Sequence, residues 1–123
     1  MDAVFDTNIV TDAAKGDPRA EEEFQRYERV FISRITWIEM LVSIKQGQEE
    51  QEPALLDLLD RFEIVELSPA IAAEAVRIRR QLRLKVPDAI ILATAHDKRC
   101  PLITRNTKDF PEGDTGVRVP YRH

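Results

Sequence analysis

Apolar runs alternate with amphipathic stretches along the chain, and this alternation predicts strands that are separated by helices. The first apolar run ends at Asp6, where Thr7 and Asn8 favour a turn or a helix cap. Apolar runs of this kind predict strands at residues 3–5, 30–32, 64–67 and 102–103, with a short edge strand at 117–119. Strand and helix therefore alternate from the first residues onward.

The stretches between these runs have helical periodicity or helix start signals. They predict helices directly after Asp6 and at 21–28, 35–44, 55–62, 71–84 and 87–95, with a loop at 48–53. Strands separated by helices pair in parallel through right-handed crossovers, with helices on both faces of the sheet. The expected fold is a three-layer α/β/α domain whose functional crevice lies beyond the carboxyl ends of the strands. Asp6, Ser33 and Thr104 fall at those ends.

Length and composition predict one globular domain over residues 1–123. Hydrophobic residues make up 43% and charged residues 33%, and the longest apolar run, 89–95, is far too short to span a membrane. The first residues lack the pattern of a secretion leader, and Cys100 has no second cysteine to pair with. We therefore expect a cytoplasmic protein.

The net charge of −4 argues against a protein that coats nucleic acid by bulk electrostatics. It does not argue against a nuclease, because carboxylates that hold divalent cations lower the net charge of the enzyme. One basic stretch, 77–85, contains four arginines and a lysine. It is either a solvated helix face or a surface that steers RNA or an acidic partner.

Three acidic residues, Asp6, Glu39 and Asp88, stand in segments that suggest chemistry. Each also has a structural explanation: Asp6 caps a helix, Glu39 turns outward into water, and Asp88 stabilises a first helical turn. The predicted fold brings all three to the carboxyl edge of the sheet. Carboxylates packed together there repel one another, which suggests a bound cation. Oxygen ligands favour magnesium or manganese, and the chain has too few His and Cys residues for a zinc site.

Four segments together resemble the PIN-domain ribonucleases of the VapC toxin type: DTNIV from Asp6, ISRITWIEM around Glu39, VPDAIILATA around Asp88, and LITRNTKDF near the end. The resemblance covers nearly the whole chain. It implies a five-stranded parallel sheet, magnesium- or manganese-dependent cleavage of RNA, a homodimer, and a small antitoxin that inhibits the toxin.

The resemblance also implies site residues. Asp6, Glu39 and Asp88 match the three main acidic positions of the family metal site, and Thr7, Asn8 and Thr104 match polar positions around it. The family has an acid or amide after the fourth strand, where this chain offers Asn106 and, three residues later, Asp109. We expect Asp6 and Asp88 to bind metal directly, while Glu39 either completes the ligand set or accepts a proton from water.

Other classes fit less well. A response-regulator receiver needs an acidic pair after its first strand, and a haloacid-dehalogenase-like phosphatase needs an acid where Asn8 stands. A PIN-like protein that binds RNA or an antitoxin with little turnover remains open because Asn106 replaces an acid. His96 and Trp37 are expected to be surface or packing residues.

Overall fold

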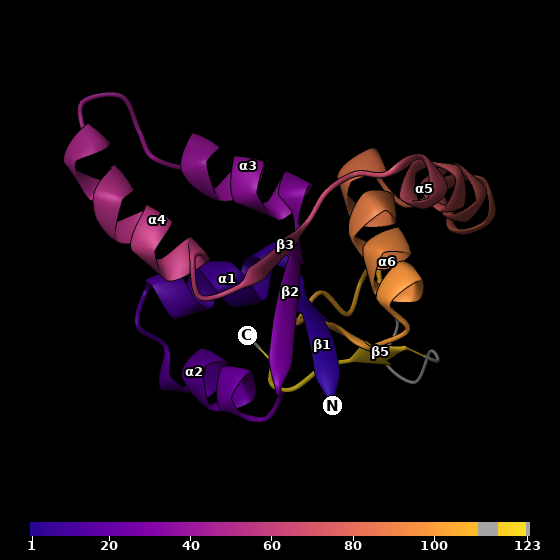
Figure 1. Ribbon diagram of the computed structural model, residues 1–123, viewed down its shortest axis with the longest axis horizontal. Coiled ribbons are helices and arrows are strands. Elements are labelled where there is room, and N and C mark those ends of the chain that lie inside the picture. Colours follow the sequence, from indigo (N-terminus) through magenta and orange to yellow (C-terminus); the bar gives the residue numbers. More distant parts are fainter. Residues whose placement is uncertain (111–115, 123) are drawn as a thin grey trace.

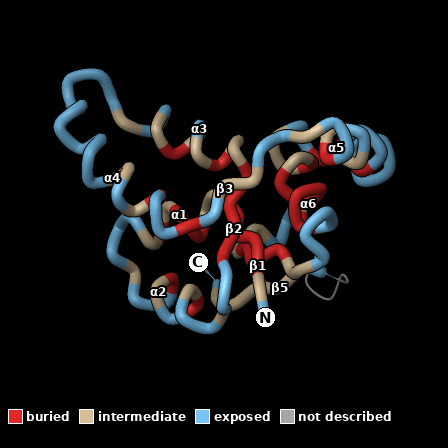
Figure 2. Tube along the Cα trace, viewed as in Figure 1, coloured by how far each residue is buried: buried red, intermediate tan, exposed pale blue. Residues whose placement is uncertain are grey.

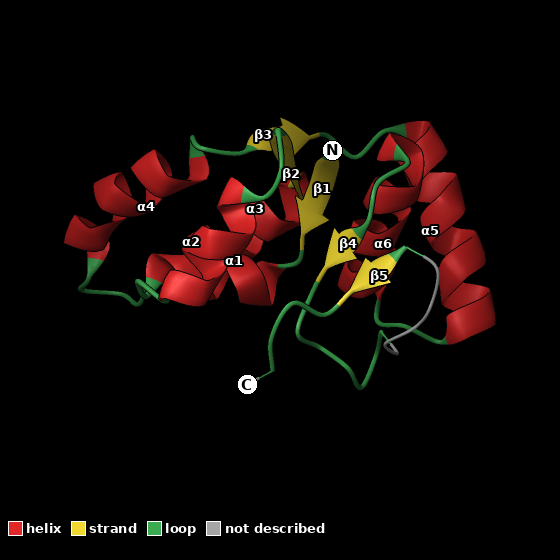
Figure 3. Ribbon diagram, turned by 90° about the horizontal axis from the view of Figure 1, so that it is seen from below, coloured by secondary structure: helices red, strands yellow, loops and turns green. Residues whose placement is uncertain are grey.

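The computed structural model describes residues 1–110 and 116–122, and within them the strands form one five-stranded sheet. Every neighbouring pair of strands is parallel, and the order across the sheet is β3-β2-β1-β4-β5 (Figure 3). The strands are β1 (Asp2–Phe5), β2 (Arg29–Ser33), β3 (Glu63–Val65), β4 (Leu102–Ile103) and β5 (Val117–Arg118). The predicted α/β fold with a five-stranded parallel sheet is confirmed.

Within the described residues, six α-helices and one short 3-10 helix lie between β1 and β4. They are α1 (Thr7–Ala14), α2 (Pro18–Gln25), α3 (Arg34–Val42), η1 (Glu49–Gln51), α4 (Glu52–Leu59), α5 (Pro69–Leu82) and α6 (Val86–Lys98). Figure 1 shows α5 and α6 on one side of the sheet and α1, α2 and α4 on the other. The three layers of the predicted architecture are therefore present.

Polar side chains fix where several helices begin. Asp6, Asp17, Ser33 and Ser68 each accept a hydrogen bond from a backbone N–H in the first turn of the helix that follows. The predicted loop at 48–53 is wrong, because η1 and the first turn of α4 occupy most of it. Pro53 is compatible with this helix start, because its fixed φ angle suits the first turn of a helix and its missing N–H is not needed there.

Alternating side chains of the strands feed two hydrophobic cores, one on each face of the sheet. Val4, Phe31 and Leu102 pack against α5 and α6, whereas Phe5 and Ile103 pack in the core beneath α1 and α2. Figure 2 shows that the buried residues are concentrated in the central strands and in α6. The two cores hold β1 rigidly in the middle of the sheet.

This topology decides where functional groups can meet. The carboxyl ends of β1, β2 and β4 are neighbours, so Asp6, the start of α3 and Thr104 lie at one edge. No helix within the described residues is both long and apolar enough to cross a bilayer.

Candidate active site

Asp6 lies where β1 ends and α1 begins, and it is only 4% exposed. Its Oδ1 accepts a hydrogen bond from the backbone N–H of Thr7 at 2.8 Å. Its Oδ2 accepts hydrogen bonds from the Thr104 hydroxyl at 2.8 Å and from the Asn8 amide at 3.2 Å. Asp6 is therefore a helix cap and, at the same time, a fixed carboxylate at the edge of the sheet.

Burial is the main cause of an unusual pKa at Asp6. It raises the pKa of this carboxyl from 3.8 to about 6, although the hydrogen bonds from Thr104 and Thr7 act in the opposite direction. The negative charges of Asp88 and Glu39 raise the pKa further. Both charged residues that act on the pKa of Asp6 are therefore negative.

Glu39 is held by a chain of hydroxyl groups. The Thr7 hydroxyl donates a hydrogen bond to Glu39 Oε1 at 2.7 Å and lies 3.0 Å from the hydroxyl of Thr36. A hydroxyl has one proton, so the bond between the two threonines must be donated by Thr36. Thr36 is completely buried, which fixes the start of this chain inside the protein. Glu39 is thus oriented toward the end of β1, although the sequence also allowed it to face water.

Asp88 lies in the first turn of α6 and is partly buried. Burial raises its pKa, and the charges of Asp109 and Glu39 raise it further, whereas Lys85 lowers it. Within residues 1–110 and 116–122, Asp88 forms no salt bridge that would offset this repulsion. Asp88 therefore interacts with the negative charges of Asp6 and Glu39.

Asn106 and Asp109 bind each other in the loop after β4. The Asn106 Nδ2 donates to Asp109 Oδ2 at 3.0 Å, and the backbone N–H of Asp109 donates to Asn106 Oδ1 at 3.2 Å. The Asn106 N–H donates to the Thr104 hydroxyl at 3.0 Å, and Phe110 closes the turn with its ring buried. Asp109 thus shapes a turn, and its negative charge also raises the pKa of Asp88.

Asp88 and Glu39 are close enough to Asp6 for their charges to raise its pKa, but the three carboxylates do not converge on one position. Among the described residues, no group of three or more His, Cys, Asp or Glu side chains is arranged to hold a metal ion. The donors are oxygens of Asp6, Glu39 and Asp88 in a region of excess negative charge, and this chemistry fits a hard divalent cation.

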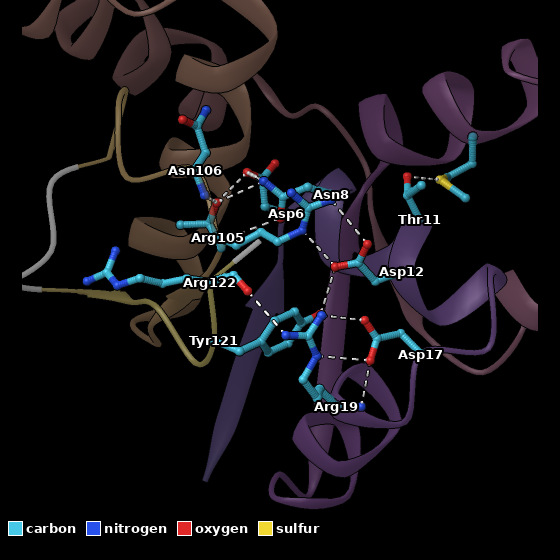
Figure 4. Close-up of polar contacts among 12 residues, drawn as sticks. Asp6, Asn8, Thr11, Asp12, Asp17, Arg19, Arg105, Asn106, Tyr121 and Arg122 are labelled. Carbon is cyan, nitrogen blue, oxygen red and sulfur yellow. Dashed lines mark hydrogen bonds and ion pairs between the residues drawn. The ribbon is translucent and has the colours of Figure 1, made fainter.

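A second polar cluster, which the sequence patterns do not predict, lies near Asp6 (Figure 4). Asp12, in α1, is 7% exposed and binds Arg105 in a bidentate ion pair, with Nε–Oδ2 and Nη2–Oδ1 distances of 2.7 and 3.1 Å. The Tyr121 hydroxyl donates to Asp12 Oδ2 at 2.9 Å. Burial alone would raise the pKa of Asp12, but the bonds from Arg105 and Tyr121 lower it below its usual value. The only signal in the sequence was the spacing of Asn8 and Asp12, four residues apart on one helix face.

Glu23 is a third buried carboxylate, and it is also paired with arginine. Its Oε2 accepts hydrogen bonds from Arg118 Nε at 2.8 Å and from the Tyr27 hydroxyl at 2.7 Å, and its Oε1 accepts one from Arg118 Nη2 at 3.2 Å. Burial alone would raise the pKa of Glu23, and these bonds lower it. This ion pair joins β5 to α2, away from the acids that follow β1.

The remaining candidates behave as surface or packing groups. His96 Nδ1 lies 2.7 Å from Glu74, which also pairs with Arg77, and all three side chains are on the outer part of α5 and α6. Trp37 is partly buried against the core, with the Arg34 guanidinium 4.8 Å from its ring centre. The basic residues of 77–85 are exposed, and one of them, Arg77, binds Glu74 and Gln81 on the same helix.

Two apolar depressions flank the molecule. A groove of about 500 Å³ lies between α1, α3 and α4, and its lining includes Thr11, Met40, Ile44, Leu55 and Leu58. A second depression, of about 290 Å³, lies between α5 and α6 beside exposed apolar side chains, namely Leu67, Val76 and Val86.

Comparison with known proteins gives a family match over most of the chain. Residues 3–114 match the family model described as PIN domain. A chain of a solved toxin–antitoxin complex from Klebsiella pneumoniae is 43% identical, with a TM-score of 0.85, and the match covers 98% of this chain and 99% of that one.

More distant structures share the fold. A chain of VapBC2 from Rickettsia felis, bound to a promoter DNA fragment, is 22% identical with a TM-score of 0.82, and the match covers 96% of this chain and 98% of that one. A chain of DNA-bound VapBC from Salmonella typhimurium is 23% identical with a TM-score of 0.82, and the match covers 96% of both chains. A comparison with curated proteins found no match.

Proposed function

The chain belongs to the PIN-domain family, and from this premise we propose that it is a VapC-type toxin, a divalent-metal-dependent ribonuclease that is inhibited by an antitoxin. The whole chain, residues 1–123, acts as one PIN domain in this proposal. The solved relative that is 43% identical is described as a toxin–antitoxin complex, which supports the assignment to a toxin–antitoxin pair. An RNA substrate and an antitoxin partner place the activity in the cytoplasm.

One observation carries the enzymatic part of the proposal. Three carboxylates are buried among the described residues: Asp6, Asp12 and Glu23. Arginine neutralises Asp12 and Glu23, whereas Asp6 has only neutral hydrogen-bond donors and two further acids in electrostatic range. A buried carboxylate without a positive partner is unfavourable, so a cation is the expected complement.

The proposed mechanism uses the chain's own groups as ligands and positioning groups. A bound magnesium or manganese ion would lower the pKa of a water molecule and stabilise charge on the attacking and leaving oxygens of the phosphodiester. Asp6 and Asp88 are the proposed direct ligands. Thr7 engages Oε1 of Glu39, which leaves Oε2 to complete the ligand set or to accept the proton of the attacking water. Asn106 and Asp109 lie at the margin of this site and would bind the metal through water.

The test is cleavage of single-stranded RNA by protein freed of any partner, with magnesium, with manganese and with excess chelator. We expect cleavage with either metal and none in chelator. Glu23→Gln is the matched control for the acid-site variants, because Glu23 is equally buried but pairs with arginine away from the site. Full RNA cleavage in chelator by nuclease-free protein would reject the carboxylate–metal mechanism.

A second candidate is a binding protein that sequesters RNA or an antitoxin with little turnover. The observation in its favour is Asn106, a neutral residue at the fourth family position whose amide is engaged by Asp109. A gel-shift measurement on the same preparations separates the two functions. Tight RNA binding without cleavage under any metal condition supports the binding protein.

The two apolar depressions are the proposed binding sites of protein partners. We propose that an apolar antitoxin segment fills the groove between α1, α3 and α4, and that a basic side chain of the antitoxin binds the acidic region. The exposed apolar residues beside α5 and α6 are the proposed contact of a homodimer. Co-purification with the antitoxin and light scattering of the isolated chain test the two contacts separately.

A further inference from the structure

We propose that Arg105 is a positioning residue, which acts through Asp12 to fix the segment after β4 against Asp6 and thereby sets the metal affinity of the site. The part that concerns metal rests on the proposed function, whereas the positioning itself does not. The two partners of this ion pair, Asp12 and Arg105, are 93 positions apart in the sequence.

Three sets of hydrogen bonds join α1 to the segment 104–106, like the rungs of a ladder. The first is the bond from the Thr104 hydroxyl to Asp6 Oδ2. In the second, Asn8 donates to the Thr104 hydroxyl at 3.2 Å, and the Arg105 backbone N–H donates to Asn8 Oδ1 at 3.3 Å. The third is the ion pair of Arg105 with Asp12, and of the three rungs it is the one in which both partners are charged. Asp6, Asn8 and Asp12 thus present their side chains to one short segment.

The charged rung is the strongest of the three. Bidentate bonds between a guanidinium and a carboxylate are shorter and stronger than bonds between neutral groups, and they fix direction as well as distance. The two neutral bonds of Asn8 are longer, at 3.2 and 3.3 Å. Loss of the third rung would leave Arg105 joined to α1 through the bond from its backbone N–H to Asn8, while the sheet bond from the Thr104 N–H to the Arg118 carbonyl remains. If Arg105 moved, its chain neighbour Thr104 would be displaced too. The backbone of Asn106 would follow, because its N–H donates to the Thr104 hydroxyl.

The carboxyl-terminal segment completes the anchor. Tyr121 donates to the same Asp12 oxygen that Arg105 Nε binds, and the Arg19 guanidinium lies 4.4 Å from the centre of the Tyr121 ring. Arg19 also donates to the carbonyl oxygen of Arg122 at 3.2 Å. Figure 4 shows these groups on the side of Asp12 that faces away from Asp6. The guanidinium of Arg105 is therefore bound to Asp12, and its influence on Asp6, Glu39 and Asp88 is indirect.

The experiment compares two conservative variants of the full chain, Arg105→Lys and Arg118→Lys. Arg118 is the matched control because it binds buried Glu23 with the same pair of atoms, at 2.8 and 3.2 Å, and its side chain has no bond to the acids. Lysine keeps the positive charge but cannot form the bidentate pair. Tyr121→Phe is a milder variant that removes one bond to Asp12 and leaves the ion pair.

Two readouts separate positioning from general stability. Hydrogen exchange, followed by NMR without metal, reports the backbone N–H groups of residues 105 and 106. We expect exchange about tenfold faster there in Arg105→Lys and unchanged in Arg118→Lys, because tenfold corresponds to about 1.4 kcal/mol, which is within the range for one hydrogen bond. Manganese binding, measured by calorimetry, should weaken about tenfold in Arg105→Lys alone. Tyr121→Phe should give smaller changes in the same direction.

Each remaining outcome decides a part of the proposal. Equal exchange at residues 105 and 106 in the two lysine variants would overturn the positioning role. Faster exchange with unchanged manganese affinity would overturn the link to metal. If the wild-type chain binds no manganese, the metal site of the proposed function is wrong, and the exchange data alone decide whether Arg105 positions the segment. If Arg105→Lys does not fold, Tyr121→Phe decides by the same two measurements.

Discussion

The two ends of α1 hold buried carboxylates in opposite electrostatic situations. At its beginning, Asp6 is surrounded by neutral donors and by the charges of Glu39 and Asp88. Near its end, Asp12 is bound by Arg105 and Tyr121. The same residue type therefore has a raised pKa at one end of an eight-residue helix and a lowered pKa at the other.

This difference separates a carboxylate that stabilises the fold from one that is available for chemistry. A paired carboxylate has its complement within the chain, and removing either partner leaves a buried charge. An unpaired one is maintained although it costs stability, which is typical of functional sites. The predictions that follow test this contrast, beginning with the largest expected effect.

Asp88→Asn should reduce RNA cleavage about a hundredfold or more, because a direct ligand to the cation contributes several kcal/mol in the transition state. The melting temperature in chelator should stay the same or rise, since the substitution removes repulsion with Asp109 and Glu39. Initial cleavage rates and thermal melting measure the two effects. Glu23→Gln, measured below its melting range, should cleave like the wild type. Wild-type rates in Asp88→Asn would move the active site elsewhere.

The pH dependence of stability should have opposite signs for the two kinds of carboxylate. Asp6 has a pKa of about 6 in the folded protein and 3.8 unfolded, so the folded state binds its proton more tightly. Its effect therefore destabilises the metal-free protein progressively as the pH rises from about 4 to 6, by about 2 to 3 kcal/mol at most. Chemical denaturation in chelator should show Asp6→Asn gaining stability relative to the wild type across this range. A constant difference between them would contradict the raised pKa.

Glu23→Gln should lower the free energy of unfolding by about 2 kcal/mol at pH 7, because it leaves the Arg118 guanidinium without its charged partner. The pKa of Glu23 is lowered from 4.5, so its contribution is complete above that value and is lost as the pH falls through the folded pKa. The difference from the wild type should therefore shrink below about pH 4. Equal stabilities at pH 7 would show that the pair contributes nothing.

Asp109→Asn should raise the magnesium concentration for half-maximal cleavage a few-fold, the smallest of these effects, because Asp109 lies at the margin of the site. Asn106→Asp should lower that concentration by adding a charged ligand. Magnesium titrations of the cleavage rate measure both. If Asp109→Asn leaves the metal dependence unchanged and lowers the melting temperature, its role is confined to the turn that buries Phe110.

Local patterns in the sequence were enough to predict most of the fold. Apolar runs gave all five strands to within two residues, because burial on both faces of a parallel sheet leaves a strong local signal. The loop predicted at 48–53 is wrong, because this segment forms a 3-10 turn and the start of a helix. Its glutamates and glutamines have no apolar periodicity that would indicate a helix.

For the candidate site, the sequence indicated the acids but not the groups that orient them. Asp6, Glu39 and Asp88 were indicated by the motifs around them, and their metal role stays a prediction. The partnership of Asp12 with Arg105 depends on how β4 is placed beside β1, which no local pattern contains. The role of Thr36 was missed for the same reason, because its contact is with Thr7 across two elements.

The bond between Asp6 and Thr104 spans 98 positions of the sequence. During synthesis, Asp6 leaves the ribosome first, and Thr104 follows 98 positions later. Until then β4 is missing from the sheet, and Asp6 lacks the hydroxyl that orients it. A nascent chain that lacks residues 102–106 therefore cannot assemble the proposed site, so any activity of that site would begin only after this segment has been made and has joined the sheet.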